Sequence, residues 1–267
     1  MPRFRRFGQG TYQLDGDQCT ESVEIGLAAG YRHVDTAQSY ENEAAVGDAL
    51  AAADVDREDV FVATKLATGN LAYDDAVESA RGSAEALGVD AIDLLYVHWP
   101  INTYDAPETC RALDDLVDEG LVRNVGLSNF RPDQLREARD LLDAPVFAHQ
   151  VECHPLLQQE ELREIAREDD HWLVAYCPIA RNQVADVPEL VSIADTHDAS
   201  PAQVSLAWLL SKDEIAAIPK ATGGAHIREN LAATDLELDD EDVATIDALD
   251  ERRRIVDFEE APWNARP

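Results

Sequence analysis

Short apolar runs alternate along the chain with longer segments whose apolar positions recur every three or four residues. Each run has the length and the Val, Ile and Leu content of a strand that is buried on both faces. Such strands are typical of a parallel sheet that helices cover on both sides. Seven clear runs and a weaker eighth span residues 31–37, 60–66, 92–99, 122–128, 147–153, 171–178, 215–220 and 234–238.

The segments between these runs carry signals that begin and end helices. Serine before proline at Ser200-Pro201 is a typical helix start, and the glycines Gly30, Gly88 and Gly120 are typical helix ends. The predicted helices span 42–53, 73–87, 107–119, 132–142, 159–168, 188–197, 201–211 and 239–249.

This alternation predicts the fold. Eight strand–helix units in 267 residues fit an α/β fold, the (β/α)8 TIM barrel, as a single domain over residues 1–267. A doubly wound sheet fits less well, because no Gly-x-Gly-x-x-Gly follows any predicted strand. Barrel enzymes hold their chemistry at the carboxyl ends of the strands, so we expect functional residues there.

The composition indicates a folded protein with a strongly acidic charge. Apolar residues make up 45% of the chain, and 54 acidic against 22 basic residues give a net charge of −32. Only three of the basic residues are lysines. Because about 1 M salt shortens the Debye length to about 3 Å, we interpret this charge as adaptation to a salt-rich cytosol, as in a halophile. So acidic a surface repels phosphate backbones, and we expect no nucleic-acid partner.

Other sequence features bear on location. No apolar stretch approaches the roughly 18 residues of a membrane span, and the first residues lack the apolar segment of a secretory signal. The four cysteines lie far apart with no Cys-x-x-Cys pair, which argues against a disulfide framework or a zinc ribbon. We therefore expect a cytoplasmic protein that does not associate with membranes.

Chemically active side chains stand where several of the apolar runs end. Asp35, Lys65 and His98 lie at the ends of the first three runs, and Tyr40 follows Asp35 closely. Each alone has an ordinary explanation, since an Asp–Lys pair is more often structural and a lone histidine or tyrosine more often belongs to the core. Together they are harder to dismiss, because burying charged groups is costly unless they neutralise one another. The pattern predicts one polar site at the end of the barrel.

The chain resembles the aldo-keto reductase family over nearly its whole length. The order Tyr40-x-Asn42-Glu43 followed by Ser128-Asn129-Phe130 is specific to that family. Within it, the chain is similar to the short-loop microbial enzymes, which include proteins like 2,5-diketo-gluconate reductase. The resemblance is carried by residues 10–12, 30–37, 40–43, 65, 98–100, 126–130, 150–152, 176–179, 218–220 and 229–230.

The resemblance implies NAD(P)H-dependent reduction of an aldehyde or ketone, a keto-sugar included, to an alcohol. Tyr40 would protonate the carbonyl oxygen as hydride arrives, and the Lys65 ammonium would lower the tyrosine pKa toward working pH. Asp35 would hold Lys65 and balance its charge, and His98 would orient the carbonyl. No metal is implied, because the chemistry of hydride transfer belongs to the cofactor.

The resemblance also assigns binding residues. Ser128, Asn129 and Gln150 would bind the nicotinamide carboxamide, Tyr176 would stack on the ring, and Lys220 would face the phosphates. The implied cofactor residues are Thr11, Tyr12, Asp35, Ser128, Asn129, Gln150, Tyr176, Pro178, Lys220, Thr222, Glu229 and Asn230, the last two near the adenine, and the implied substrate residues are His98, Trp99 and Trp263.

Two departures from the family pattern affect these implications. The family usually places Ser directly after the phosphate-binding lysine and Arg six residues beyond it, but Ala221 and His226 stand there in this chain. Arg binds a 2′-phosphate as a charged fork, whereas His titrates at about 6.5. NADP(H) is favoured, and NAD(H) stays open. Arg228 would take the place of the missing arginine if the glycines 223–224 redirect the loop. The short N-terminus also leaves little room for the hairpin that usually closes the bottom of the barrel.

Two alternatives from other functional classes stay open. His33 and Asp35 share one strand face, as a metal-dependent hydrolase on the same barrel would need, with His149 and His154 as further ligands. A non-catalytic regulatory subunit that binds nicotinamide is the other, although the full set of catalytic residue types argues against it. We expect a monomer that acts on a small-molecule carbonyl substrate.

Overall fold

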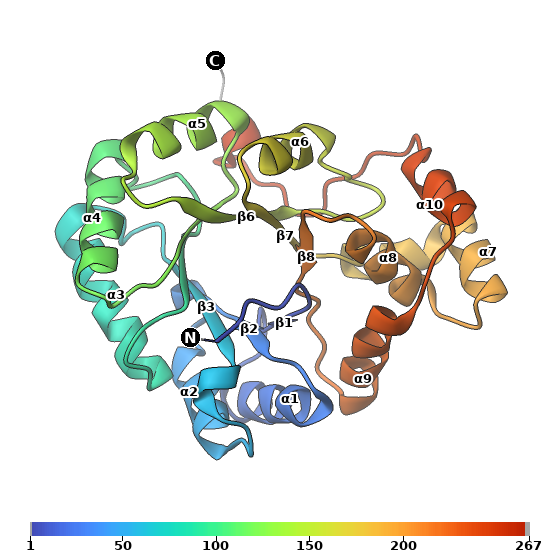
Figure 1. Ribbon diagram of the computed structural model, residues 1–267, viewed down its shortest axis with the longest axis horizontal. Coiled ribbons are helices and arrows are strands. Elements are labelled where there is room, and N and C mark those ends of the chain that lie inside the picture. The colour runs from blue at the N-terminus through green and yellow to red at the C-terminus, as the bar shows by residue number, and fades with distance from the viewer. Residues whose placement is uncertain (1, 265–267) are drawn as a thin grey trace.

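Eight parallel strands pair in chain order in the computed structural model, which describes residues 2–264. Just before the first strand, Phe7 forms a bridge with Ala217 of the last, and the Gly8 amide donates to the Ala217 carbonyl at 2.9 Å. The sheet therefore closes on itself into a barrel (Figure 1). The strands are β1 Gln9–Gly10, β2 His33–Asp35, β3 Phe61–Leu66, β4 Leu94–Val97, β5 Val125–Ser128, β6 Val146–Glu152, β7 Trp172–Tyr176 and β8 Ile215–Ala217.

Helices surround the barrel and bury one side against it (Figure 1). Their starts follow local capping rules: the Ser200 hydroxyl accepts from the Gln203 amide at 3.3 Å, and a proline opens the first turn. The α-helices are α1 Gly16–Ala29, α2 Glu43–Ala52, α3 Tyr73–Leu87, α4 Ala106–Asp118, α5 Pro132–Leu141, α6 Glu160–Glu168, α7 Pro188–Thr196, α8 Pro201–Leu210, α9 Gly224–Ala232 and α10 Asp240–Asp247. Short 3₁₀ turns are η1 Gln38–Tyr40, η2 Arg57–Asp59, η3 Ala180–Asp186, η4 Ala233–Asp235 and η5 Pro262–Asn264.

The (β/α)8 barrel is confirmed, with one predicted strand misplaced. The seven clear runs correspond to β2–β8, but the strand predicted at 234–238 is wrong. That stretch holds η4 and an irregular segment whose Leu236 and Leu238 pack on the core without pairing to the sheet. The remaining strand is β1, whose two residues, Gln9 and Gly10, offer no apolar alternation for a pattern to detect. Helices α1 and α9 were also not among the predicted elements.

An aromatic side chain from the start of the chain closes the bottom of the barrel. The centroid of the Phe4 ring lies 5.1 to 5.3 Å from the ring centroids of His33, Phe61, Phe147 and Trp172. These four residues lie at or near the first residues of their strands. One ring thus fills this end of the barrel.

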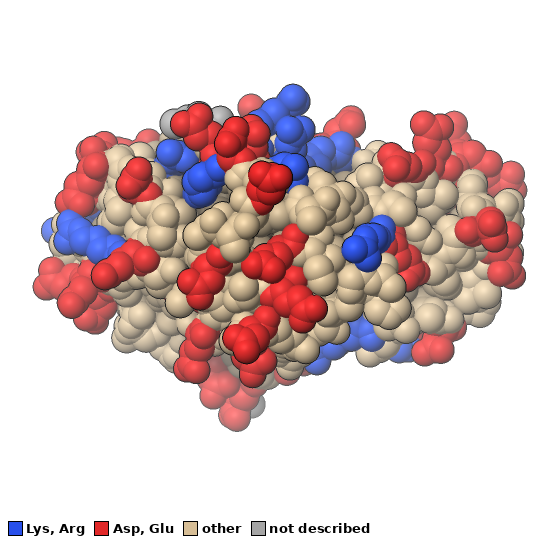
Figure 2. Space-filling view, turned by 90° about the horizontal axis from the view of Figure 1, so that it is seen from below, with Lys and Arg blue, Asp and Glu red and all other residues tan. Residues whose placement is uncertain are grey.

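On the face in Figure 2, Asp and Glu side chains are spread widely, whereas Lys and Arg gather mainly in a smaller group at the upper edge. Across residues 2–264, no helix combines the length and the apolar character needed to cross a membrane.

At Gly47, α2 packs closely against the backbone of α3. A Cβ added at Gly47 would lie 2.5 Å from the Ala86 carbonyl oxygen and 3.0 Å from that of Leu87, and backbone atoms cannot rotate away. We expect Gly47→Ala to lower the free energy of unfolding by about 1–3 kcal/mol in urea titrations. Gly82→Ala is the matched control, because this exposed position on α3 has nothing within 4 Å of the added atom. There we expect a gain of about 0.5–1 kcal/mol, and a loss at both positions would contradict this account.

Candidate active site

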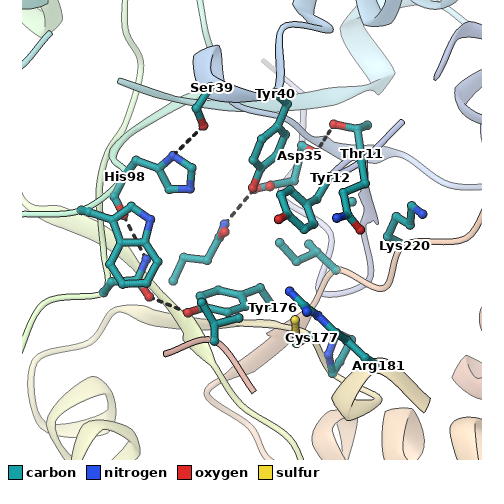
Figure 3. A pocket seen from close by; sticks show the side chains of 18 of the residues that line it. Thr11, Tyr12, Asp35, Ser39, Tyr40, His98, Tyr176, Cys177, Arg181 and Lys220 are labelled. Carbon is teal, nitrogen blue, oxygen red and sulfur yellow. Dashed lines mark hydrogen bonds between the residues drawn. The ribbon is translucent and has the colours of Figure 1, made fainter. Parts of the chain in front are cut away.

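A cavity of about 650 Å³ opens at the carboxyl ends of the strands. Its wall includes Asp35 from β2, Gln150 from β6 and Tyr176 from β7, each at or near the last residue of its strand (Figure 3). This end lies opposite the Phe4 side chain. Because barrel enzymes carry their chemistry at the carboxyl end, this cavity is the candidate active site.

A buried ion pair forms the floor of the site. Lys65 is 0% and Asp35 2% exposed, and the Lys65 ammonium donates to Asp35 Oδ1. The ammonium also donates to the Thr36 carbonyl oxygen at 2.7 Å, and Asp35 Oδ2 accepts from Gln150 Nε2 at 2.7 Å. Burial lowers the pKa of Lys65, and the Asp35 carboxylate opposes that shift. The structure therefore brings together the acid and the base predicted from the strand ends.

Tyr40, the last residue of η1, lies beside this pair. The Lys65 ammonium is 5.1 Å from the centroid of the Tyr40 ring, which in turn lies 5.2 Å from the ring of Tyr12 and 5.7 Å from that of His98. Burial raises the pKa of Tyr40 well above its usual value, and the charge of Asp35 adds to the shift. The expected lowering of this pKa by Lys65 is therefore wrong, because Asp35 compensates the ammonium and burial disfavours a phenolate. The Tyr40 phenol keeps its proton at neutral pH.

The turn that carries Tyr40 is held by the asparagine of its motif. The buried Asn42 side chain donates from Nδ2 to the carbonyl oxygens of Thr11 at 3.0 Å and Leu14 at 2.7 Å. Its Oδ1 accepts from the Thr36 hydroxyl at 2.6 Å. These bonds connect η1 to the segment after β1 and to the end of β2. The spacing Tyr-x-Asn therefore fixes where the phenol lies.

His98 follows β4 and lies beside Tyr40, on the same side of the cavity. Its Nδ1 lies 3.2 Å from the Ser39 hydroxyl, and its backbone carbonyl accepts from Asn129 Nδ2 at 3.0 Å (Figure 3). Burial and the neighbouring Lys65 ammonium lower the pKa of His98 to about 3. The ring is therefore neutral at working pH and offers one N–H donor, which suits the orientation of a carbonyl oxygen.

Amide and aromatic groups line the next part of the wall. Asn129 adopts a left-handed backbone with φ 63°, which asparagine tolerates better than most residues. Its side chain donates to the Ser128 hydroxyl at 3.0 Å and accepts from the Tyr176 hydroxyl at 2.7 Å. Asn129, Gln150, Tyr176 and the neighbouring Pro178 line the cavity, whereas Ser128 is fully buried behind them.

Lys220, after β8, lies on the side of the cavity away from His98 (Figure 3). It takes part in none of the ion pairs that residues 2–264 form. Thr11 and Tyr12 line the same cavity. Of the other residues assigned to a cofactor, Thr222, Glu229 and Asn230 lie beyond Lys220, on α9 or just before it, and outside the cavity wall.

The first turn of α9, which follows Lys220 in the chain, carries a second cation. Arg228 folds back so that its guanidinium donates to the Gly224 carbonyl oxygen at 3.1 Å, in the first turn of its own helix. His226 instead lies 3.1 Å from the Glu229 carboxylate. The arginine is therefore placed at the beginning of the helix, although it stands two residues later than the family pattern.

The predicted substrate residues divide into two groups. His98 and Trp99 line the cavity, but Trp263 lies behind Trp99, with the two ring centroids 5.6 Å apart. Trp263 lines a second cavity of about 320 Å³, which shares Asn129 with the first. Phe258, whose ring lies 4.9 Å from Trp99, takes the place on the main wall that was predicted for Trp263.

Other lining residues were not predicted at all. A strand-end signal was present for Cys177, Ile179 and Ile218, because they closely follow Tyr176 and β8. Val256 and Phe258 come from an irregular segment near the chain end that no periodicity marks. The unpredicted lining residues are Gly10, Gln13, Ser39, Cys177, Ile179, Arg181, Ile218, Val256 and Phe258.

The residues of the metal-hydrolase alternative are dispersed. His33 lies at the bottom of the barrel, His149 packs 6.4 Å from His171, and His154 bonds to Glu152 at 3.0 Å. Within residues 2–264, no three His, Cys, Asp or Glu side chains gather as a metal site requires. The geometry does not support this alternative.

Known proteins are similar to the chain over nearly all of its length. The model of the Aldo/keto reductase family matches residues 5–251. The chain is 37% identical to an aldo-keto reductase of Mycolicibacterium vanbaalenii, over 93% of this chain and 89% of that protein. It is 36% identical to a 9,11-endoperoxide prostaglandin H2 reductase of Trypanosoma cruzi (95% and 90% covered) and 35% identical to a methylglyoxal reductase of Yersinia pestis (94% of each).

Two solved structures share the fold of the chain over nearly its whole length. The barrel superposes with a TM-score of 0.92 on a putative 2,5-diketo-D-gluconic acid reductase B, at 36% identity over 96% of this chain and 92% of that one. An aldo-keto reductase from a Medee basin deep-sea metagenome library also gives a TM-score of 0.92, at 32% identity over 97% of this chain and 96% of that one.

Removing one partner of the buried pair should lower the free energy of unfolding strongly. Asp35→Asn leaves the buried Lys65 ammonium without its counter-charge, and we expect the free energy of unfolding to fall by about 3–5 kcal/mol in urea titrations. The double variant Asp35→Asn/Lys65→Met contains no unpaired charge and should recover much of that loss. A double variant as unstable as the sum of the two single variants would contradict direct coupling.

Proposed function

Because this chain belongs to the aldo/keto reductase family and is an oxidoreductase that acts on carbonyl groups, we propose that it reduces an aldehyde or ketone to an alcohol with hydride from a reduced nicotinamide and a proton from Tyr40. The observation that carries this proposal is the meeting of Tyr40, the Lys65–Asp35 pair and His98 at one side of one cavity. These residues come from segments far apart in the chain, and burying the pair has a stability cost that a function would explain.

The cavity suits a nicotinamide cofactor, the kind that members of the family use. Asn129 and Gln150 present amide groups to a carboxamide, and the half-buried Tyr176 presents an aromatic face to a ring. Lys220 lines the wall as a cation outside the ion pairs of the described residues, which supports a role in phosphate binding. When bound there, a reduced nicotinamide supplies the hydride.

Tyr40 is the proposed proton donor. Its raised pKa keeps the proton on the phenol until negative charge develops on the substrate oxygen. The Lys65 ammonium, 5.1 Å from the ring centroid, then stabilises the phenolate that forms. Asp35 keeps Lys65 in that place and in its charged form.

His98 is proposed to hold the carbonyl group against Tyr40. The neutral ring donates a hydrogen bond from its N–H to the substrate oxygen and adds no positive charge to the site. The Ser39 hydroxyl on Nδ1 and the Asn129 amide on the backbone carbonyl restrict its movement. Carbonyl orientation and proton donation are therefore divided between two residues.

For the substrate we propose a small carbonyl compound, with 2-oxoaldehydes and keto-sugars as the first classes to assay. Relatives of the chain carry the names methylglyoxal reductase and 2,5-diketo-D-gluconic acid reductase B, and both names denote carbonyl groups beside a second oxygenated carbon. Trp99 and Phe258 form an apolar wall next to His98, which would also accept an aromatic substituent.

We propose that NADP(H) is preferred. Ala221 and His226 remove the hydroxyl and guanidinium that the family pattern offers to a 2′-phosphate, but Arg228 places a guanidinium at the first turn of α9. A helix N-terminus beside a guanidinium favours the 2′-phosphate of NADP(H) over the ribose hydroxyls of NAD(H).

Tyr40→Phe tests the proton donor. We expect the rate of carbonyl reduction to fall by about 10²–10⁴, the usual contribution of a general acid. Binding of NADPH, followed by quenching of tryptophan fluorescence, should change less than threefold. Tyr104→Phe is the matched control, since Tyr104 lies outside the cavity wall against Phe130 and should retain full activity. A Tyr40→Phe enzyme that keeps more than a tenth of its rate would mean that another group donates the proton.

Arg228→Ala tests the cofactor preference. We expect kcat/KM with NADPH to exceed that with NADH by more than tenfold in the unmodified protein. Loss of the guanidinium should reduce that ratio by about 10–100-fold, the weight of one charged hydrogen bond. His226→Ala should leave the ratio within twofold, because the His226 ring lies against the Glu229 carboxylate at 3.1 Å. An unmodified protein that prefers NADH would contradict the proposal.

A further inference from the structure

The end of the described chain forms one side of the cavity. After α10 the chain returns across the carboxyl end of the barrel, and Val256 and Phe258 from this stretch line the cavity. The Phe258 ring meets the Trp99 ring edge-on, with centroids 4.9 Å apart. We call residues 255–264 the C-terminal segment.

The C-terminal segment keeps its shape through bonds among its own residues. Asp257 Oδ1 accepts from Trp263 Nε1 at 2.9 Å and from Asn264 Nδ2 at 2.7 Å. Asn264 Nδ2 also donates to the Phe258 carbonyl oxygen at 2.9 Å. These bonds close the segment into a loop but do not fix it to the barrel, so the position of Phe258 depends on the attachment points.

One of these points is a buried carboxylate. Glu152, the last residue of β6, is 0% exposed. Its Oε1 accepts from the Ile255 amide at 2.5 Å and its Oε2 from the Val256 amide at 2.7 Å. His154 Nε2 lies 3.0 Å from Oε1. The carboxylate therefore holds two successive backbone amides, the second of which belongs to the lining residue Val256.

The other attachments are weaker or lie farther from the cavity wall. The Arg253 amide donates to the Leu156 carbonyl oxygen at 2.7 Å, before the segment begins. The half-exposed Arg131 side chain donates to the Pro262 carbonyl oxygen at 2.8 Å, close to the far end of the segment. Among these contacts, only that of Glu152 comes from a fully buried charged side chain. Charge-assisted bonds are about twice as strong as neutral ones.

Strand β6 connects this attachment to the chemistry of the site. Side chains two residues apart on a strand lie on the same face. Gln150 reaches Asp35 Oδ2 at 2.7 Å, and Glu152, two residues later, reaches the C-terminal segment. The same rigid strand therefore sets the position of the floor of the site and of one side wall.

We propose that Glu152 is a positioning residue that determines which carbonyl substrates the cavity accepts, by holding Val256 and Phe258 opposite Trp99. The proposal rests on the carbonyl reduction proposed above. Glu152 does not line the cavity and touches no reacting atom. An aromatic aldehyde, whose ring extends to the wall of Trp99 and Phe258, depends on Glu152, whereas a three-carbon carbonyl such as methylglyoxal does not reach that wall.

Hydrogen exchange tests the attachment without any assay of activity. In the unmodified protein, the amides of Ile255 and Val256 should exchange at least 100-fold more slowly than those of the exposed Glu259 and Glu260. Glu152→Gln replaces one acceptor oxygen by an NH₂ group that faces a backbone N–H. We expect exchange at 255 and 256 to become at least tenfold faster. Equal exchange of the four amides in the unmodified protein would overturn the proposal, even if the variant does not fold.

Steady-state kinetics test the effect on substrate choice. We expect Glu152→Gln to raise KM for 4-nitrobenzaldehyde by about 5–10-fold, a change of about 1 kcal/mol, with KM for methylglyoxal and both kcat values within twofold. A residue that serves only stability would not change the two KM values differently. Phe258→Ala should reproduce the shift, and the double variant should add nothing further, because both changes remove the same contact.

Asp93→Asn is the matched control. Asp93 is also a buried carboxylate, 1% exposed, and accepts from the Val62 amide at 3.0 Å and from Arg57 at 3.1 Å. It precedes β4 and so lies at the opposite end of the barrel. We expect this variant to lose stability while both KM values and the exchange at 255 and 256 stay unchanged.

The outcomes separate this inference from the proposed function. If the unmodified protein reduces both aldehydes but Glu152→Gln leaves their KM ratio unchanged, the positioning role is overturned and carbonyl reduction stands. If the unmodified protein reduces no carbonyl compound with NADPH or NADH, the proposed function fails, and the role in substrate choice fails with it. The exchange result still decides whether Glu152 holds the segment.

Discussion

The ion pair between Lys65 and Asp35 links the closure of the barrel to its chemistry. Taking two charges out of water is costly, and the cost is offset only when the remaining hydrogen-bonding groups of both are satisfied. Here the Thr36 carbonyl accepts a second hydrogen bond from the ammonium, and the Gln150 amide donates to the second carboxylate oxygen. Because β2, β3 and β6 contribute to it and β6 lies across the barrel from β2, the pair is complete only when the barrel is closed. A local error in strand pairing would leave a buried charge without its partner.

Burial and these two charges together set the protonation of both neighbouring rings. Asp35 adds to the effect of burial on Tyr40 and raises its pKa, whereas Lys65 adds to the effect of burial on His98 and lowers its pKa to about 3. The result is a phenol that keeps its proton and an imidazole that carries no charge. Two neutral hydrogen-bond donors then face the same cavity, so a carbonyl oxygen placed between them meets no competing formal charge until the reaction creates one.

The sequence determined most of the fold and the floor of the site, because each rests on a pattern that a single chain displays. Strands β2–β8 are apolar runs, and Asp35, Lys65 and His98 are polar residues that interrupt those runs. The features that the sequence could not indicate depend on packing between distant segments. Strand β1 has two residues and is recognisable only by its neighbours, and Phe258 reaches the wall from an irregular segment. The pKa of Tyr40 was expected to fall but rises, because the sequence shows a neighbouring charge and not the degree of burial.

Exposed charges and the buried charges of the candidate active site respond differently to salt. Exposed charges are screened by salt within about 8 Å at physiological ionic strength and less at higher salt, but a fully buried pair excludes the ions that would screen it. Of the three lysines, Lys65 is buried in the site and Lys220 lines its wall, while arginines form most of the surface ion pairs. The planar guanidinium of arginine suits bidentate hydrogen bonds to exposed carboxylates, whereas the compact ammonium of lysine fits a buried position beside one carboxylate. Changes in surface charge can therefore accumulate without altering the field at Tyr40, because that field depends on groups that solvent ions do not reach.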